Sequence, residues 1–430
     1  MRIAVVVQRF GRGILGGAET HAGVVARILA RHHDVEVLTS TAGDYQTWSE
    51  AFPAGESDDD GLRVRRFRVA RGRAASWEAM AALLHDGLAG SDFARSSESG
   101  KAAFAERLRA WPDPLQEEFV RAQGPLCPDL HAHLGRAHHD RALFFTYLYP
   151  TTYDGLTAVP RGRAFVIPTL HDEAPAYLPV FGRRLARARL LCSTDAEVAL
   201  VGRLYPSSPP SARRIGYGIP LPARETSPKR ERPPFLLYAG RIDSQKGVGD
   251  LIEGYRALRE ASPDAPALKL IGERAMPLPD IPGLEVLGFV DEAEKDRLMR
   301  EALALVHLSP YESLCIVLLE AMARETPILV NGASDVMVEH CRRGGGVWVR
   351  DAAGFVAAVR RLLADPELAR RLGRAGRAYV EEEYGLPAYE RRLLEVFPAG
   401  VLTDPDGRWT IRFYANFAID ETPAASRPDL

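Results

Sequence analysis

Cysteine is scarce in this sequence, and long apolar runs are missing. The 430 residues include only four cysteines, Cys127, Cys192, Cys315 and Cys341, without the paired spacing of a disulfide framework or a zinc site. This usage is typical of a reducing compartment. The apolar run at residues 3–7 is too short for a signal peptide or a membrane span. We therefore expect a cytoplasmic protein.

Excess charge of either sign is also missing. The formal net charge is -2, so no global field favours binding to nucleic acid or to an anionic membrane. We expect no nucleic acid partner. The arginine-rich segment 62–73 alternates charged and apolar residues, as a half-exposed strand does, and leaves a local peripheral contact with anionic lipid open. Oligomeric state cannot be predicted from this composition.

The order of apolar segments predicts an α/β fold with two Rossmann-like domains. Strands separated by helical patterns predict a parallel sheet covered on both faces, and in a first series they are expected at 3–7, 35–40, 62–70, 127–134, 142–148, 164–170 and 188–195. A second series is expected at 235–241, 267–273, 284–290, 302–310 and 326–332. The proline-rich and charged segment 221–234 reads as a linker between domains 1–220 and 235–384. Facing parallel sheets predict a ligand cleft between the domains.

Two glutamates stand out in the segment 307–323. A buried helix is predicted over 313–323, with Glu312 just before it, where unpaired backbone N–H groups attract negative ligand groups. Glu320 falls within the apolar run, where a desolvated carboxylate needs a partner. That partner is a sugar or ribose hydroxyl, or else an arginine, unless the side chain reaches solvent along the helix edge.

Three motifs point to other chemistry but are incomplete. Gly11, Gly13 and Gly16 outline a dinucleotide-binding loop, yet the second strand ends at Thr39–Thr41 without the acidic residue that binds ribose. The histidine-rich segment 131–140 and the acidic segment 57–61 lack strict ligand spacing. We expect the histidine-rich segment to hold strand-end residues that line the cleft, with His131 and His133 on one face of a strand. We expect the acidic segment to be a solvated loop. No metal site is predicted.

Four motifs, in order along most of the chain, resemble those of the retaining glycosyltransferases of family GT4. "PYESLCIVLLEAMARETPIL" at 310–329 resembles the family's E-x7-E element, and "YAGRIDSQKG" at 238–247 resembles its strand-end segment with Arg241 and Lys246. "GGAET" at 16–20 resembles the N-terminal glycine turn, and "PTLHDE" at 168–173 resembles the strand that ends in His-Asp. This resemblance implies the GT-B fold, with the helix and tail at about 385–430 packed back on the first domain.

The resemblance also implies roles for individual residues. Glu312 would hold donor-sugar hydroxyls, Glu320 the ribose hydroxyls, and Arg241 with Lys246 the diphosphate. His171 would contact the transferred sugar, although an isolated His171–Asp172 pair would also be compatible with a structural role. Independently of the family, fixed cations at a strand end suit the negative charge of a leaving phosphate. The remaining donor-binding candidates are Gly16, Gly17, Glu273, Val290, Ser313, Leu314 and Cys315.

The sequence therefore predicts a retaining, metal-independent glycosyltransferase that needs no cofactor. It would move a hexose from a GDP- or UDP-sugar to a glycan, lipid-linked or small-molecule acceptor, as in polysaccharide or glycoconjugate synthesis. Ser313 and Leu314 replace the family's usual aromatic residue and glycine, so the donor sugar stays open. The sequence of the region 71–126, where family members vary with their acceptor, does not indicate which acceptor binds. The sequence of the tail 401–430 does not indicate its role. A catalytically silent sugar-nucleotide-binding protein, an epimerase or phosphorylase on a similar fold, and an NAD-dependent oxidoreductase are the alternatives.

Overall fold

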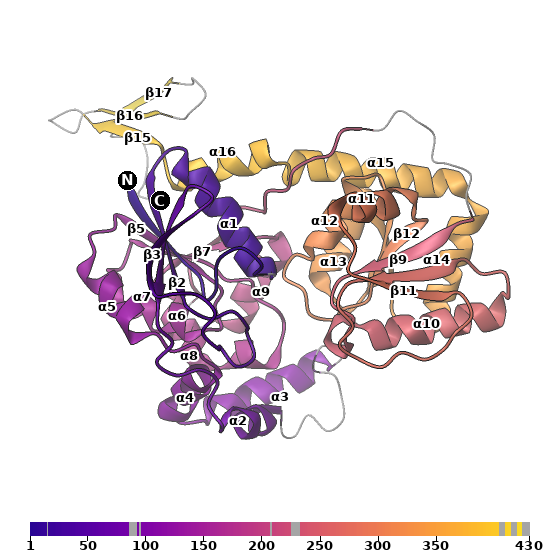
Figure 1. Ribbon diagram of the computed structural model, residues 1–430, viewed down its shortest axis with the longest axis horizontal. Coiled ribbons are helices and arrows are strands. Elements are labelled where there is room, and N and C mark those ends of the chain that lie inside the picture. The colour runs from indigo at the N-terminus through magenta and orange to yellow at the C-terminus, as the bar shows by residue number, and fades with distance from the viewer. Residues whose placement is uncertain are drawn as a thin grey trace.

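The computed structural model contains two large sheets, each flanked by helices, and a small third sheet (Figure 1). It describes residues 1–14, 16–85, 93, 96–206, 209–224, 233–403, 409–413 and 419–423. Most of the predicted linker, 225–232, lies outside the described residues. No helix in the described part of the chain is long and apolar enough to cross a bilayer.

The first sheet has eight strands in the order β3-β4-β2-β1-β5-β6-β7-β8. Its strands are β1 (Arg2–Val6), β2 (Asp34–Ser40), β3 (Gly55–Asp59), β4 (Leu62–Phe67), β5 (Arg141–Phe145), β6 (Ala164–Ile167), β7 (Arg189–Cys192) and β8 (Ala212–Arg214). All neighbours pair in parallel except β3 and β4. The central strands are buried on both faces, which explains their continuous apolar runs.

The helices of the first domain cover both faces of this sheet (Figure 1). They are α1 (Gly17–Ala30), α2 (Trp77–His85), α3 (Glu98–Arg109), α4 (Asp113–Gln123), α5 (Pro128–Arg136), α6 (Pro150–Tyr153), α7 (Gly155–Ala158), η2 (Ala174–Tyr177), α8 (Pro179–Leu185) and α9 (Asp195–Leu204). The region 71–126, whose role the sequence left open, supplies α2, α3 and α4.

Two expectations for this domain are wrong. The segment 127–134 is not a strand, because Pro128 begins helix α5 and the buried Leu130 and Leu134 follow helical spacing. The acidic segment 57–61 is not a loop, because it overlaps β3, which pairs antiparallel with β4 at the sheet edge. The missed strand β8 has only three residues, two of them arginines.

The second sheet has six parallel strands in the order β11-β10-β9-β12-β13-β14. They are β9 (Phe235–Ala239), β10 (Ala267–Ile271), β11 (Leu284–Gly288), β12 (Ala304–His307), β13 (Ile328–Asn331) and β14 (Gly346–Val349), the last of which the sequence did not reveal. Around them lie η3 (Ser244–Lys246), α10 (Val248–Ala261), α11 (Glu292–Glu301), α12 (Ile316–Met322), α13 (Asp335–His340), η4 (Cys341–Gly345), α14 (Ala352–Ala364) and α15 (Pro366–Glu383).

After α15 the chain crosses back to the first domain. Helix α16 (Leu386–Val396) buries Tyr389 and Leu393 in the same core as Ile3 of β1. The Tyr389 hydroxyl lies 2.7 Å from Nε2 of the buried His21 on α1. The chain thus passes between the domains twice, once after β8 and once after α15. Where these two connecting segments meet, the N–H of Ile219 donates to the carbonyl of Tyr384 at 2.8 Å.

The last strands, β15 (Gly400–Thr403), β16 (Trp409–Phe413) and β17 (Ile419–Pro423), form a separate antiparallel sheet. In Figure 1 this small sheet projects beside the first domain near the end of α16. It is not an edge of either large sheet.

Candidate active site

Two adjoining cavities lie where the carboxyl ends of the two sheets face each other. The smaller cavity has a volume of about 430 Å³ and the larger about 1090 Å³. They share Gly17 and Tyr45 from the first domain and Gly240, Lys246 and Val317 from the second. An interdomain cleft is therefore present at the strand ends, where open parallel sheets bind ligands.

All twelve site residues singled out from the sequence line these cavities. The smaller cavity is lined by Gly17, His171, Lys246, Glu312, Ser313, Leu314 and Cys315. The larger cavity is lined by Gly16, Gly17, Arg241, Lys246, Glu273, Val290 and Glu320. The structure brings the predicted residues together, while their individual roles stay predictions.

Lys246 stands at the junction of the two cavities and is paired with Glu312. Its Nζ atom lies 2.8 Å from Oε1 of Glu312. Burial raises the pKa of Glu312, but the charge of Lys246 and the nearby His307 outweigh burial and bring the pKa to about 2. Burial lowers the pKa of Lys246, and Glu312 more than reverses this, so the pKa is raised. Both side chains are therefore charged at neutral pH.

The loop that carries Lys246 depends on a glycine. Asp243 caps the short helix η3 by accepting the N–H of Lys246 at 2.9 Å. Gly247 then adopts φ 69°, and a Cβ at this position would overlap the carbonyl group of Leu308 at the end of β12. Only glycine combines that conformation with such close backbone packing. The turn therefore holds Lys246 against the loop that contains Glu312.

Arg241 connects the two domains at the larger cavity. Its guanidinium donates to Asp243 and to the hydroxyl of Tyr45, which belongs to the first domain. Burial lowers the pKa of Arg241, but its bond with Asp243 raises the pKa above the usual value. Arg241 and Lys246 therefore place two fixed positive charges on one cavity wall.

His171 follows β6 and lies in the smaller cavity. Its Nδ1 atom is 3.4 Å from Oε1 of Glu173, which accepts the Tyr147 hydroxyl at 2.8 Å. Burial lowers the pKa of His171, but Glu173 and then Glu312 raise it above its usual value. The expected His171–Asp172 pair is not formed, because Asp172 instead binds Lys101 at 2.7 Å. The adjacent Glu173 is therefore the residue that orients His171.

Glu320 is less buried than the apolar run around it suggested. Its side chain is 29% exposed and faces the larger cavity, with Oε1 3.4 Å from Nζ of Lys295 on α11. The predicted helix begins three residues later than expected, at Ile316. The arginine partner considered from the sequence is thus a lysine, and free space remains beside the carboxylate.

Two residues that line the smaller cavity have unusual backbone conformations. Thr169, before His171, has φ 48°, and Cys315, before α12, has φ 61°. Non-glycine residues seldom adopt this left-handed region, and they do so most often at functional sites. The loops after β6 and β12 are therefore held in specific shapes at the cavity.

With this geometry in view, we compared the chain with known proteins. Residues 222–379 match the family described as glycosyl transferases group 1. This match covers most of the second domain. Glycogen synthase of Mycobacterium tuberculosis is 33% identical over 175 residues, which cover 36% of this chain and 40% of that protein. The chain thus spans about two fifths of the length of this curated relative.

Solved structures match both domains. Sucrose-phosphate synthase from Thermosynechococcus elongatus has a TM-score of 0.63 and 18% identity, covering 92% of this chain and 98% of that one. HepE of Anabaena, solved in complex with UDP-glucose, has a TM-score of 0.58 and 14% identity, covering 92% and 99%. The predicted α/β fold of two parallel-sheet domains, GT-B, is confirmed. The group 1 match contains Arg241, Lys246 and both motif glutamates, whereas Gly16, Gly17 and His171 lie before it.

Some residues of the site were not foreseen from the sequence. Arg9 and Glu19 form a buried ion pair at 2.7 Å and line the smaller cavity. Glu19 belongs to the quoted "GGAET" segment, but Arg9 carries no sequence signal. His307, at the end of β12, also lines the smaller cavity, and burial lowers its pKa to about 4.

His307, Glu312 and Cys315 form a cluster whose ligand atoms lie within 4.8 Å of one another. A metal ion bound there would lie beside the ammonium group of Lys246, which already neutralises Glu312. Repulsion between the two cations opposes metal binding at this position. The residues therefore fit a site whose positive charge comes from Lys246.

Proposed function

We propose that the protein is a retaining, metal-independent glycosyltransferase that transfers a hexose from a UDP- or GDP-sugar to a hydroxyl acceptor. The observation that carries this proposal is the wall of the larger cavity where Arg241 and Lys246 stand together, beside Glu312 and Glu320. The group 1 family match of the second domain and the similarity to a fold solved with UDP-glucose support it.

The donor would lie across both cavities. Its diphosphate would bind Arg241 and Lys246, its ribose hydroxyls would bind Glu320, and its base would lie toward Glu273 and Val290. The sugar would extend into the smaller cavity, where Glu312 accepts its hydroxyls and the backbone of residues 313–315 lies alongside. This placement gives Glu320 hydroxyl partners in the space beside its carboxylate.

The cations would act on the leaving group. When the bond between C1 and the phosphate oxygen breaks, its electron pair stays on the phosphate, and Lys246 and Arg241 stabilise the added negative charge. Because both cations are held by hydrogen bonds before the reaction, Lys246 to Glu312 and Arg241 to Asp243, little reorganisation is needed. This role replaces the charge that a metal ion supplies in other enzymes.

Retention of the configuration at C1 would result from attack of the acceptor on the same face of the sugar that the phosphate leaves. Three carboxylates line the smaller cavity, and each is already engaged, Glu19 by Arg9, Glu173 by His171 and Glu312 by Lys246. None is a free nucleophile. The acceptor oxygen therefore forms its bond to C1 on the face that the phosphate leaves, and the acceptor proton passes to a phosphate oxygen. Trapping a glycosyl-enzyme adduct would contradict this path.

The acceptor would enter from the first domain. The wall there combines Arg9, Tyr147 and Tyr149 with His171, which suits a compound with several hydroxyl groups. We propose a glycan, a lipid-linked or a small-molecule acceptor in the cytoplasm, with a lipid-linked one met at the inner face of the membrane.

The test begins with the nucleotide. UDP, GDP and ADP are screened for thermal stabilisation of the protein, and sugar conjugates of the best binder are then tested for transfer to a panel of acceptors. Proton NMR of the product gives the anomeric configuration, which is expected to match that of the donor. Transfer is expected to continue in EDTA. No stabilisation by any nucleotide, inversion at C1, or loss of transfer in EDTA under conditions where the protein stays folded would overturn the proposal.

A further inference from the structure

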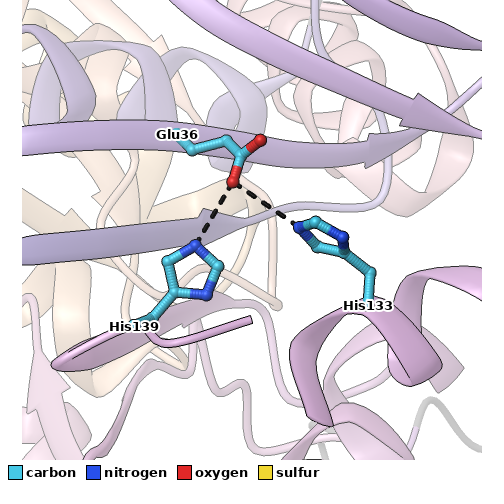
Figure 2. Close-up of side chains that lie close together, drawn as sticks. All are labelled: Glu36, His133 and His139. Carbon is cyan, nitrogen blue, oxygen red and sulfur yellow. Dashed lines mark hydrogen bonds and ion pairs between the residues drawn. The ribbon is translucent and has the colours of Figure 1, made fainter. Parts of the chain in front are cut away.

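Glu36, His133 and His139 converge on one point outside the cleft. Glu36 lies near the beginning of β2, His133 on α5, and His139 between α5 and β5 (Figure 2). None of the three lines either cavity between the domains. In Figure 2 both imidazole rings point toward the same carboxylate oxygen of Glu36. The cluster is therefore separate from the proposed transfer chemistry.

The spacing of these atoms suits a tetrahedral metal ion. Oε2 of Glu36 lies 3.2 Å from Nε2 of His139 and 3.6 Å from Nε2 of His133. When one ligand atom is taken from each of the three residues, these three atoms all lie within 4.8 Å of one another. Zinc binds nitrogen and carboxylate oxygen at about 2.0–2.2 Å, so two ligand atoms of a tetrahedron are roughly 3.4 Å apart. An ion can therefore be bound with only small shifts of the side chains.

Hydrogen bonding alone leaves this cluster unsatisfied. Nε2 of His133 is buried and has no hydrogen-bond partner among the residues that the structure describes, because 3.6 Å is too long for a hydrogen bond to Glu36. A buried nitrogen aimed at a carboxylate but out of hydrogen-bonding range is costly. A metal ion between them would give both groups a partner.

The surroundings of Glu36 are also those of a metal ligand. Nε of Arg65 donates to Oε1 at 2.9 Å, which fixes the carboxylate and leaves Oε2 directed at the two histidines. Arg65 also pairs with Glu56, so its charge is balanced locally. His133 is 21% exposed at its side chain, whereas Glu36 and His139 are buried. The His133 ring is thus the part of the cluster nearest to solvent, although its Nε2 atom is buried, and a water molecule that completes the coordination would enter beside that ring.

We propose that Glu36, His133 and His139 bind one Zn²⁺ ion, with a water molecule as the fourth ligand. Two histidines and one glutamate form a known zinc ligand set. The ion ties β2 to α5 and to the segment before β5, so its effect is on the stability of the first domain. The candidate ligands come partly from the histidine-rich segment 131–140, for which the sequence predicted no metal.

The test uses the full chain, made metal-free by dialysis against a chelator that is then removed. Zn²⁺ is titrated in, bound metal is counted by mass spectrometry, and the melting temperature is recorded. The variants are Glu36→Gln, His133→Gln and His139→Gln. The matched control is His138→Gln, which changes an exposed histidine of the same segment outside the cluster.

Wild type and His138→Gln are expected to bind one equivalent and to melt at a higher temperature with zinc. The three ligand variants are expected to bind zinc at least about tenfold more weakly. Their melting temperature should also rise less when zinc is added. Co²⁺ binding to wild type, read from its visible spectrum, and histidine NMR shifts on adding zinc report on the site even if a variant does not fold. Less than one equivalent in wild type, equal binding by the ligand variants, or unshifted histidine resonances would overturn the proposal. Nucleotide binding by His133→Gln should be unchanged, so failure of this proposal leaves the transferase proposal untouched.

Discussion

Nζ of Lys246 lies 2.8 Å from Oε1 of Glu312, although 66 positions separate the two residues in the chain. The pair joins the turn after β9 to the loop before α12 and lies where the two cavities meet. A diphosphate that binds Lys246 has to share the lysine ammonium group with Glu312. The two residues should therefore respond differently to substitution.

Lys246→Ala should weaken binding of the nucleoside diphosphate. Charge-assisted hydrogen bonds contribute about 1.5–3 kcal/mol, so we expect the dissociation constant to rise by roughly 10- to 100-fold. Isothermal titration calorimetry measures it. Lys269→Ala is the matched control, because Lys269 pairs with Glu285 on β11 and lines neither cavity. An equal loss in both variants would contradict a phosphate role for Lys246.

Glu312→Gln should separate binding from transfer. The substitution frees the Lys246 ammonium, so we expect the nucleoside diphosphate alone to bind as well as in wild type or more tightly. Transfer should fall by about 100-fold, because the sugar loses a charged hydrogen-bond acceptor in the transition state. The measurements are nucleotide affinity and kcat/KM. If both fall together, Glu312 acts on the nucleotide and not on the sugar.

Glu173→Gln should change the pH dependence of stability. Glu173 and Glu312 hold the pKa of His171 above its usual 6.5. The stabilisation from a raised histidine pKa is fully present below the unfolded value and is lost as the pH rises through the folded value. The variant should therefore be more destabilised at pH 6 than at pH 9, as measured by urea unfolding.

NMR titration should also show a lower His171 pKa in Glu173→Gln. The amide oxygen can still accept the Tyr147 hydroxyl, so the packing is retained. Glu285→Gln, on β11 and outside both cavities, serves as the control. A destabilisation that does not vary with pH would argue against an ion pair between Glu173 and His171.

Tyr389→Phe should destabilise the first domain although Tyr389 belongs to α16. The Tyr389 hydroxyl lies 2.7 Å from Nε2 of His21, and both residues are buried. Removing it leaves a buried imidazole nitrogen without a partner, at a cost of about 1–3 kcal/mol. Chemical unfolding gives the change in free energy. Tyr45→Phe gives the comparison: the Tyr45 hydroxyl accepts a bond from Arg241, but at a 36% exposed position where water can replace it, so the free energy of unfolding should change by less than about 1 kcal/mol.

The sequence was most informative where burial alone decides the structure. Fully buried parallel strands need continuous apolar runs, so β1, β5, β9 and β12 could be placed. Segment 127–134 misled because polar and apolar residues alternate over 129–134, whereas Pro128 and the Leu130–Leu134 spacing indicate a helix. Strands β8 and β14 are too short to give a period of two.

The residues of the candidate site could also be predicted only in part. Residues that follow strands, such as Arg241 and His171, could be assigned to the cleft because strand ends lie at one edge of a sheet. Contacts between distant elements could not. Nothing in the local sequence pairs Arg9 with Glu19 or Lys295 with Glu320. The first pair depends on how the loop after β1 lies against α1, and the second on how α11 packs beside α12.

The two chain crossings between the domains lie side by side. Besides the bond from Ile219 to Tyr384, the N–H of Leu386 donates to the carbonyl of Ile219 at 3.2 Å. The two connecting segments are thus joined to each other by main-chain hydrogen bonds, so any rotation of one domain against the other would have to turn both segments together.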